Sequence, residues 1–364
     1  MSSTKVLPGP AEPHAAARPD AALANEACAA CHGDVAAEWR ASMHARAWVD
    51  PMFQRAFARE PLPFCRGCHA PEAAPDANPD PAVGDVGVGC ITCHVPDRDA
   101  PATVVTGTRG HRAGTTAPHA VLRDARRGTD DVCTNCHEFE FPSRDRRTSR
   151  DLMQSTRTEH LASASAKTPC PSCHMPTLPD ADETRLRNRV DHRFVASGDV
   201  ATLARAVSVE VRRTSAGIVT VTLSPKDVGH AFPTGDLFRR LVVVLEAVRT
   251  SDGSRRVLGR HVLARRFRDA VVAMGTTLRV PAGDDRVGPS GRVEVFEIPS
   301  DFTDADLRWH LDYERAELPA DASTHVEVAS RLVVAGGPVP PAGATIPSPP
   351  LQSRTASSHE GSDP

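Results

Sequence analysis

The motif Cys-x-x-Cys-His dominates this sequence of 364 residues. It occurs five times, and the five copies use all ten cysteines of the chain. In such a motif the two cysteines form thioethers with the vinyl groups of a haem, and the histidine that follows binds the iron. The sequence therefore predicts five covalently bound haem c groups. The predicted attachment residues are Cys28, Cys31, Cys65, Cys68, Cys90, Cys93, Cys133, Cys136, Cys170 and Cys173. The predicted proximal iron ligands are His32, His69, His94, His137 and His174.

Three other uses of cysteine fit this spacing less well. A disulfide scaffold does not explain a histidine directly after every second cysteine. Structural zinc takes four ligands, so a knuckle of two cysteines and one histidine leaves each metal one ligand short. A thioredoxin-like redox pair explains a single Cys-x-x-Cys, hardly five. The pattern favours haem attachment, and with it a role in moving electrons.

The composition agrees with a chain that packs around cofactors. Aromatic residues make up only 4% of the sequence, which is little for the core of a helical domain. Five porphyrins supply large apolar surfaces that short helices can cover. The formal net charge of -3 offers no basic face for nucleic acid. No run of 18 apolar residues occurs, so no transmembrane segment is expected.

The expected location follows from the cofactor. Covalent haem attachment takes place outside the cytoplasm, yet residues 1–27 contain no apolar run of the kind found in secretory signals. We give the haem motifs more weight and expect a periplasmic, cell-surface or extracellular protein. The expected partners are other redox proteins, such as cytochromes and quinol-linked or outer-membrane electron conduits.

The predicted fold class is mixed. Residues 1–24 are expected to be flexible and residues 25–197 to form a mostly helical or irregular domain packed around five haems. Residues 198–336 show alternating β-branched residues between turns, which predicts an antiparallel β-sandwich-like domain. Residues 337–364 are rich in Pro, Ser and Ala and are expected to be disordered. The candidate strands are 205–213, 217–223, 240–250, 256–263, 276–280, 291–297, 307–316 and 325–335. The candidate helices are Asp34 to about Trp48 and 149–166.

A low-spin electron carrier needs a second axial ligand on each iron, His or Met. His44 is a strong candidate: it lies about 18 Å beyond His32 along a straight helix, so it is expected to bind a neighbouring haem rather than its own. His119 is expected at the start of a short helix, and His192 directly precedes the β region. His230 lies in a loop rich in Gly and Pro that can hold one imidazole rigidly. The fifth distal ligand is left open between His111, His160 and none. His261, His310 and His325 are expected to be structural.

The sequence resembles the multihaem c-type cytochromes related to cytochrome c-554 and hydroxylamine oxidoreductase. The matching stretches are Trp39–Ala45, Gly87–Cys90 and Cys170–Pro176, and the resemblance covers roughly residues 25–335. A subset of that superfamily carries a C-terminal β domain, whose entry is similar to the segments around His192 and Gly229–Gly235. The resemblance implies closely packed haem pairs with largely bis-His ligation, and it places His44, His119, His192 and His230 at distal positions. At His160 the pattern departs, since relatives often have Trp there.

These observations favour an electron carrier over an enzyme. One alternative is a reductase or oxidase of a small nitrogen or sulfur species at one haem with an open face, for which a missing fifth distal ligand would leave room. Against it, no haem motif has the Lys variant used by relatives that reduce nitrite, and the only tyrosine, Tyr313, lies in a predicted strand. A further alternative gives the β domain the task of docking a partner in a larger electron conduit.

Overall fold

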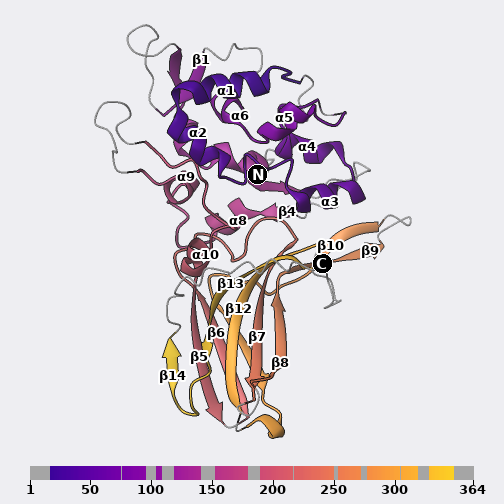
Figure 1. Cartoon of the computed structure of the whole chain (residues 1–364), viewed down its shortest axis with the longest axis vertical. Helices are drawn as coiled ribbons and strands as arrows, with labels where there is room; N and C mark the ends of the chain where they lie inside the picture. The colour runs from indigo at the N-terminus through magenta and orange to yellow at the C-terminus, as the bar shows by residue number, and fades with distance from the viewer. Residues whose placement is uncertain are drawn as a thin grey trace, which may run out of the picture.

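Two differently built parts make up the computed structural model of the chain. Short helices gather at one end and long strands at the other (Figure 1). The structure describes residues 17–74, 76–95, 104–108, 119–140, 152–178, 189–215, 217–249, 253–271, 277–303, 305–318 and 328–347. Among these residues no helix has the length and apolar character needed to span a membrane.

The helices of the first part are short because the haem motifs set their ends. In four of the five motifs a helix ends on the motif histidine itself: α4 (Pro63–His69), α6 (Cys90–His94), α7 (Asp131–His137) and α9 (Cys170–His174). The first motif differs, since α1 (Ala21–Cys31) ends one residue before His32 and α2 (Gly33–Arg40) follows it. The other helices here are α3 (Pro51–Arg59), α5 (Pro81–Val86) and α8 (Thr156–Leu161).

Few side chains pack against one another in this first part. Its buried apolar residues form three separate clusters of three residues each within the described chain: Ala21, Ile91 and Val95; Trp39, Ala45 and Val86; and Ala70, Ala73 and Val83. Such small clusters bury little apolar surface. Large apolar cofactors would supply the core that the side chains do not.

Two antiparallel four-stranded sheets form the second part. One has the strand order β11-β6-β5-β14 and the other β13-β12-β7-β8. The strands are β5 (Val207–Ser215), β6 (Ile218–Pro225), β7 (Arg239–Val248), β8 (Arg255–Leu263), β11 (Arg292–Glu297), β12 (Asp306–Ala316), β13 (Val328–Pro338) and β14 (Thr345–Pro347). The predicted antiparallel sheet in this part of the chain is confirmed.

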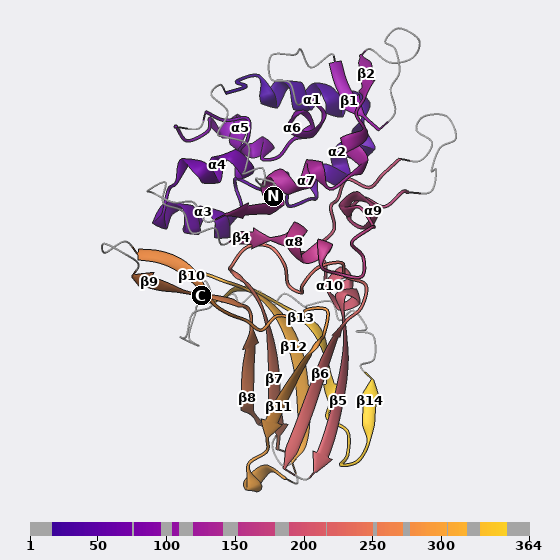
Figure 2. The same cartoon turned by 180° about the vertical axis from the view of Figure 1, so that it is seen from behind.

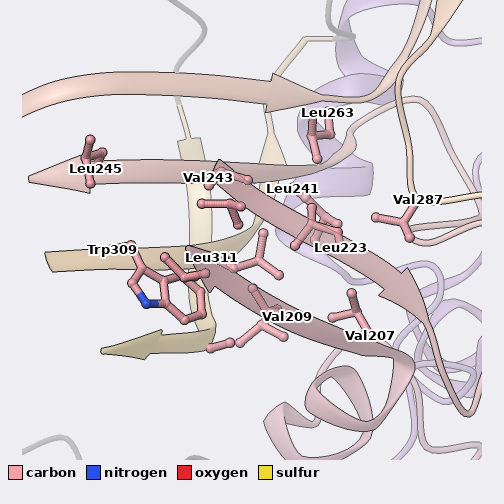
Figure 3. Close-up of a cluster of buried hydrophobic side chains, with 14 of the residues drawn as sticks. Val207, Val209, Leu223, Leu241, Val243, Leu245, Leu263, Val287, Trp309 and Leu311 are labelled. Carbon is pink, nitrogen blue, oxygen red and sulfur yellow. The ribbon is translucent and has the colours of Figure 1, made fainter. Parts of the chain in front are cut away.

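One continuous core lies between the two sheets. Alternate residues of β5 and β6 meet alternate residues of β7 and β12, as the period-2 pattern of each strand requires. Figure 3 shows Val207, Val209 and Leu223 from the first sheet facing Leu241 and Leu311 from the second. All five side chains are buried. This core stabilises the β part without any contribution from a cofactor.

Smaller elements join the two parts. The helix α10 (Val200–Ala206) precedes β5, and the two-stranded ribbon of β9 (Arg265–Val271) and β10 (Thr277–Asp284) extends from the sandwich. Two short pairs lie among the helices: β1 (Val104–Gly107) with β2 (Ala120–Arg123), and β3 (Glu138–Glu140) with β4 (Leu152–Ser155). Figures 1 and 2 both show α8 and β4 between the helical end and the sandwich.

Several local predictions are wrong. The helix predicted from Asp34 to about Trp48 starts at Gly33 and ends at Arg40, and turns follow up to Val49, while residues 152–155 are a strand and not a helix. His119 precedes a strand rather than opening a helix. Parts of the two ends that were expected to be flexible or disordered carry regular structure, since α1 starts at Ala21, β13 reaches Pro338 and β14 follows; residues 1–16 and 348–364 lie outside the described residues.

Candidate haem-binding site

The motif histidines are oriented through their Nδ1 atoms. Nδ1 lies 2.7 Å from the carbonyl oxygen of Ala47 in His69 and 2.8 Å from that of Thr106 in His94. In His137 the hydrogen bond runs the other way, because the side-chain amide nitrogen Nε2 of Gln154 donates to Nδ1 at 3.0 Å. A histidine that donates its Nδ1–H to a carbonyl oxygen presents an unprotonated Nε2, which is the arrangement that metal-binding histidines use. The local structure therefore prepares His69 and His94 to bind iron through Nε2.

Each of four motif histidines faces a second imidazole from elsewhere in the chain. The distances between ring centroids are 6.2 Å for His32 and His119, 6.1 Å for His44 and His137, 6.4 Å for His94 and His192, and 6.3 Å for His174 and His230. Two metal–nitrogen bonds of about 2 Å each, together with the two ring radii, require a separation of roughly 6 Å. All four pairs therefore leave room for one iron between the two rings.

The four pairs connect segments that are far apart in the sequence. His44 faces His137 of the fourth motif and not His32 of its own motif. His230 comes from the loop between β6 and β7 and faces His174, with the two rings only 8° from parallel. Its Nδ1 lies 3.0 Å from the carbonyl oxygen of Ala231. The β part thus contributes one imidazole to the helical part.

His69 differs from the other four motif histidines. Within the described residues, no second imidazole stands at such a distance from its ring; Phe53 of α3 stacks on the ring instead, with centroids 3.6 Å apart and planes 9° from parallel. His111 lies outside the described residues. His160 is buried elsewhere, with its Nδ1 2.8 Å from the carbonyl oxygen of Gly229. The structure therefore does not bring His160 to His69, and His111 as a fifth ligand stays a prediction.

Burial controls the protonation of the paired imidazoles. It lowers the pKa of His44 to about 4, with a smaller contribution from His174, and that of His137 to about 3, with a contribution from His44. The pKa values of His94 and His230 are lowered as well, again mainly by burial. These rings are consequently neutral near pH 7, and a neutral imidazole is the form that binds a metal.

The motif cysteines lie close to one another in specific pairs. The thiols of Cys28 and Cys90, of Cys68 and Cys136, and of Cys133 and Cys170 lie near enough to shift each other's pKa. The Cys90 thiol lowers the pKa of Cys28 to about 7. None of the ten cysteines, all of which lie in the described residues, forms a disulfide. The first motif therefore adjoins the third, and the fourth adjoins both the second and the fifth.

Phe194 fills the space between two of the imidazole pairs. Its ring centroid lies 4.4 Å from that of His44 and 6.0 Å from that of His192. Phe194 also has a positive φ of 49°, which is unusual for a bulky residue and costs conformational energy. The sequence does not predict the contact of Phe194 with these two histidines, because packing determines the backbone conformation that makes it.

Charged residues of the β part lie beside His69 and were not foreseen from the sequence. Arg239 donates a hydrogen bond from Nε to Oδ2 of Asp236 at 2.9 Å. The pKa of His69 is lowered by burial, and the hydrogen bond to the carbonyl oxygen of Ala47 and the charge of Asp236 both oppose that shift. Arg239 acts on His137 as well. The sequence does show Asp236 and Arg239 at a spacing of three, which is typical of an ion pair, but it does not relate this pair to a haem motif.

The geometry fits haem c as the cofactor. In each motif one cysteine stands four residues before the histidine and the other directly before it. The paired imidazoles have the spacing that an iron needs, and the surrounding side chains form only small clusters. When bound, haem iron supplies one-electron redox chemistry, while the protein supplies the axial ligands and the burial that tune it.

Comparison with known proteins agrees with this geometry. Residues 27–95 match the family model described as cytochrome c554 and c-prime. The fold is similar to the crystal structure of a penta-heme cytochrome c552 from Thermochromatium tepidum, with a TM-score of 0.62 and 22% identity over 86% of this chain and 98% of that chain. No curated protein matches the sequence. With its five Cys-x-x-Cys-His motifs, its match over residues 27–95 and its similar fold, this chain is similar to the multihaem c-type cytochromes of the superfamily that includes cytochrome c554.

Proposed function

We propose that the chain carries electrons through five covalently bound haems, four of which are each held between two histidines. The observation that supports this most directly is the separation of 6.1 to 6.4 Å in all four imidazole pairs. Two histidine ligands keep an iron low-spin and leave no coordination position for a substrate. A methionine ligand raises the reduction potential of a haem, and histidine ligands are proposed here instead, so we expect low to middling reduction potentials.

The contacts between motifs support a continuous path for the electrons. Thiol contacts link the first motif to the third, and the fourth to the second and the fifth. Phe194 links the third and fourth groups, because its ring contacts both His192 and His44. The haem on the fourth motif would then be a branch point through which electrons reach the others.

Location and partners follow from the cofactor in this proposal. Haem attachment outside the cytoplasm implies a periplasmic or extracellular protein. Its partners would be other redox proteins, among them cytochromes and quinol-linked or outer-membrane electron conduits, and the exposed β part would offer a surface for docking to them.

A second candidate function concerns the haem on His69. Among the described residues this histidine has no imidazole opposite it, and Asp236 and Arg239 lie nearby. An iron with one open face next to charged groups could bind and reduce or oxidise a small nitrogen or sulfur species, since such chemistry needs both a coordination position and proton donors. A high-spin ferric haem together with turnover of nitrite or hydroxylamine would support it.

The experiment that tests the main proposal counts haems and electrons. The protein should be produced in a host that attaches haem c, and its intact mass measured. We expect a mass that corresponds to five haem additions, and five electrons taken up per chain in a reductive titration. Fewer haems, or haems that exchange no electrons with a small redox protein, would contradict the proposal.

A further inference from the structure

The loop that carries His230 is held by contacts on both sides of the histidine. Residues 229–234 lie between β6 and β7 and contact α8 of the helical part through His160 and Glu159. Backbone hydrogen bonds join Phe232 to Val287 in both directions, at 2.9 and 3.0 Å. The Nδ1 of His160 lies 2.8 Å from the carbonyl oxygen of Gly229. A Cβ at position 229 would lie 3.0 Å from that nitrogen, so a larger residue would push the His160 ring away by a few tenths of an ångström.

Arg286 is the buried cation at the centre of these contacts. Its side chain is 4% exposed. It donates from Nη1 to the carbonyl oxygen of Pro233 at 2.9 Å and from Nη2 to Oε1 of Glu159 at 2.7 Å. Two further hydrogen bonds, at 2.9 and 2.8 Å, go to the carboxylate of Asp284. A guanidinium with charge-assisted bonds on several sides is held in one orientation, and so are the groups that it bonds.

Glu159 closes the other side of the arrangement. It belongs to α8 in the helical part, and its side chain is 12% exposed. Its Oε2 accepts a hydrogen bond from Oγ1 of Thr234 at 2.6 Å, and its Oε1 accepts one from Oγ of Ser155 at 2.7 Å. The Oγ1 of Thr156 is a further partner of Thr234, at 3.0 Å. The helical part therefore contacts the loop through Glu159 and Thr156, and the sandwich contacts it through Arg286.

We infer that Arg286 and Glu159 are positioning residues that hold His230 in place as the distal ligand of the haem on His174. The inference rests on the proposed function, because it requires a haem at that motif. Without Arg286, the carbonyl oxygen of Pro233 loses its hydrogen-bond donor, and Glu159, which holds Thr234, is left as a buried carboxylate without this cation. Such a group is strongly unfavourable, so the loop moves toward water and draws His230 off the iron. The β part then controls how one haem is coordinated.

The test compares Arg286→Gln with a matched variant at the same junction. Arg265 also crosses the junction, donating to the carbonyl oxygens of Met153 and Leu152, but it touches no residue of the loop. Both variants should be purified with their haems, and the high-spin ferric haems counted by low-temperature electron paramagnetic resonance. We expect the Arg286→Gln protein to gain up to one high-spin haem per chain, which is the change expected of His230→Gly as well. We expect the Arg265→Gln protein to gain none.

Added imidazole identifies the cause of the change. It should return the new high-spin signal of Arg286→Gln to low spin, because it replaces the missing ligand. Glu159→Gln, a milder change, should produce a smaller signal of the same kind if Arg286→Gln does not fold. A haem-loaded Arg286→Gln or Glu159→Gln protein with the spin states of the original would overturn the inference, as would an equal signal from Arg265→Gln. Haem content is measured separately, so a chain without five haems would instead count against the proposed function.

Discussion

A histidine's surroundings decide whether it can be an iron ligand in this chain. His44 and His230 are half-buried, neutral and opposite another imidazole. His261 lies in β8 and has a different environment: its Nδ1 stands 2.6 Å from a carboxylate oxygen of Glu294, and its ring stacks on Phe296. The sequence predicts a structural role for His261, and its contacts in the sandwich agree with that role.

Replacing His44 tests the ligand assignment at a single residue. We expect His44→Ala to convert one low-spin haem, the one on His137, to a high-spin or water-bound form. The imidazole that faces His137 at 6.1 Å would then be absent. The ferric visible spectrum and electron paramagnetic resonance report the change. His261→Ala serves as the control and should leave the haem spectra as they were; a change of equal size in both variants would mean that the assignment is wrong.

Glu314 tests the buried charges of the sandwich. Its side chain is 0% exposed, and it accepts hydrogen bonds from Arg240 at 2.9 Å and from Arg260 at 2.8 Å. Removal of one member of a buried ion pair typically costs about 3–5 kcal/mol. We expect Glu314→Ala to lower the free energy of unfolding of the β part by about 3–5 kcal/mol. Urea unfolding monitored by circular dichroism measures this loss. The exposed Glu210, paired with Arg212, is the comparison, and Glu210→Ala should cost less than about 1 kcal/mol.

At the scale of elements, the sequence predicts what local chemistry determines. The motif helices follow from the short Cys-x-x-Cys-His loops, and the main strands follow from alternating apolar residues. The strand β9 was missed because Arg265, Arg266 and Arg268 interrupt the alternation, and β14 because it has three residues within a Pro-rich segment. The sequence predicts which histidines are candidate distal ligands, but not which motif histidine each of them faces. That pairing depends on contacts between distant segments of the chain, which local sequence patterns do not predict.

The helix α3 connects His69 to the β part, and Asp50 at its start is one of the side chains that make this connection. Asp50 caps α3 by accepting a hydrogen bond from the backbone nitrogen of Phe53 at 3.4 Å, and it pairs with Arg315 of β12 at 2.5 Å. Phe53 in turn stacks on His69. Loss of a helix cap costs about 1 kcal/mol, and loss of a partly buried ion pair adds to it.

Two substitutions at this position separate the two roles. We expect Asp50→Ala to lower the free energy of unfolding by about 1–2 kcal/mol, and Asp50→Asn to cost less because an asparagine still caps a helix. Chemical unfolding followed by circular dichroism measures both. Equal losses in the two variants would show that the ion pair with Arg315, and not the cap, is the main contribution.

At the scale of the whole molecule, the lowered pKa values of the paired imidazoles make stability depend on pH. Desolvation lowers the pKa of His44 to about 4 and that of His137 to about 3, below the value of 6.5 for an unfolded histidine. Between these values the unfolded chain binds more protons than the folded one, so stability falls as the pH drops below about 6.5 and continues to fall toward pH 4. Unfolding by urea at pH 7.5 and at pH 5 should show this loss. Equal stability at both values would contradict the lowered pKa values of these histidines.

The helical and β parts are expected to depend on haem to different degrees. The sandwich has its own continuous core, whereas the described side chains of the helical part form only three small clusters. The helical part therefore relies on its cofactors for packing, and His230 connects the two parts through a haem iron in the proposed arrangement. From the sequence, the low content of aromatic residues already indicated this dependence.

The central claim is that paired histidines hold most of the irons, and a count of spin states tests it most directly. Low-temperature electron paramagnetic resonance of the fully oxidised holoprotein, with integrated intensities, assigns each iron to low or high spin. The account predicts four low-spin haems with two histidine ligands each, and leaves only the haem on His69 free to differ. Two or more high-spin irons in the unmodified protein would contradict it.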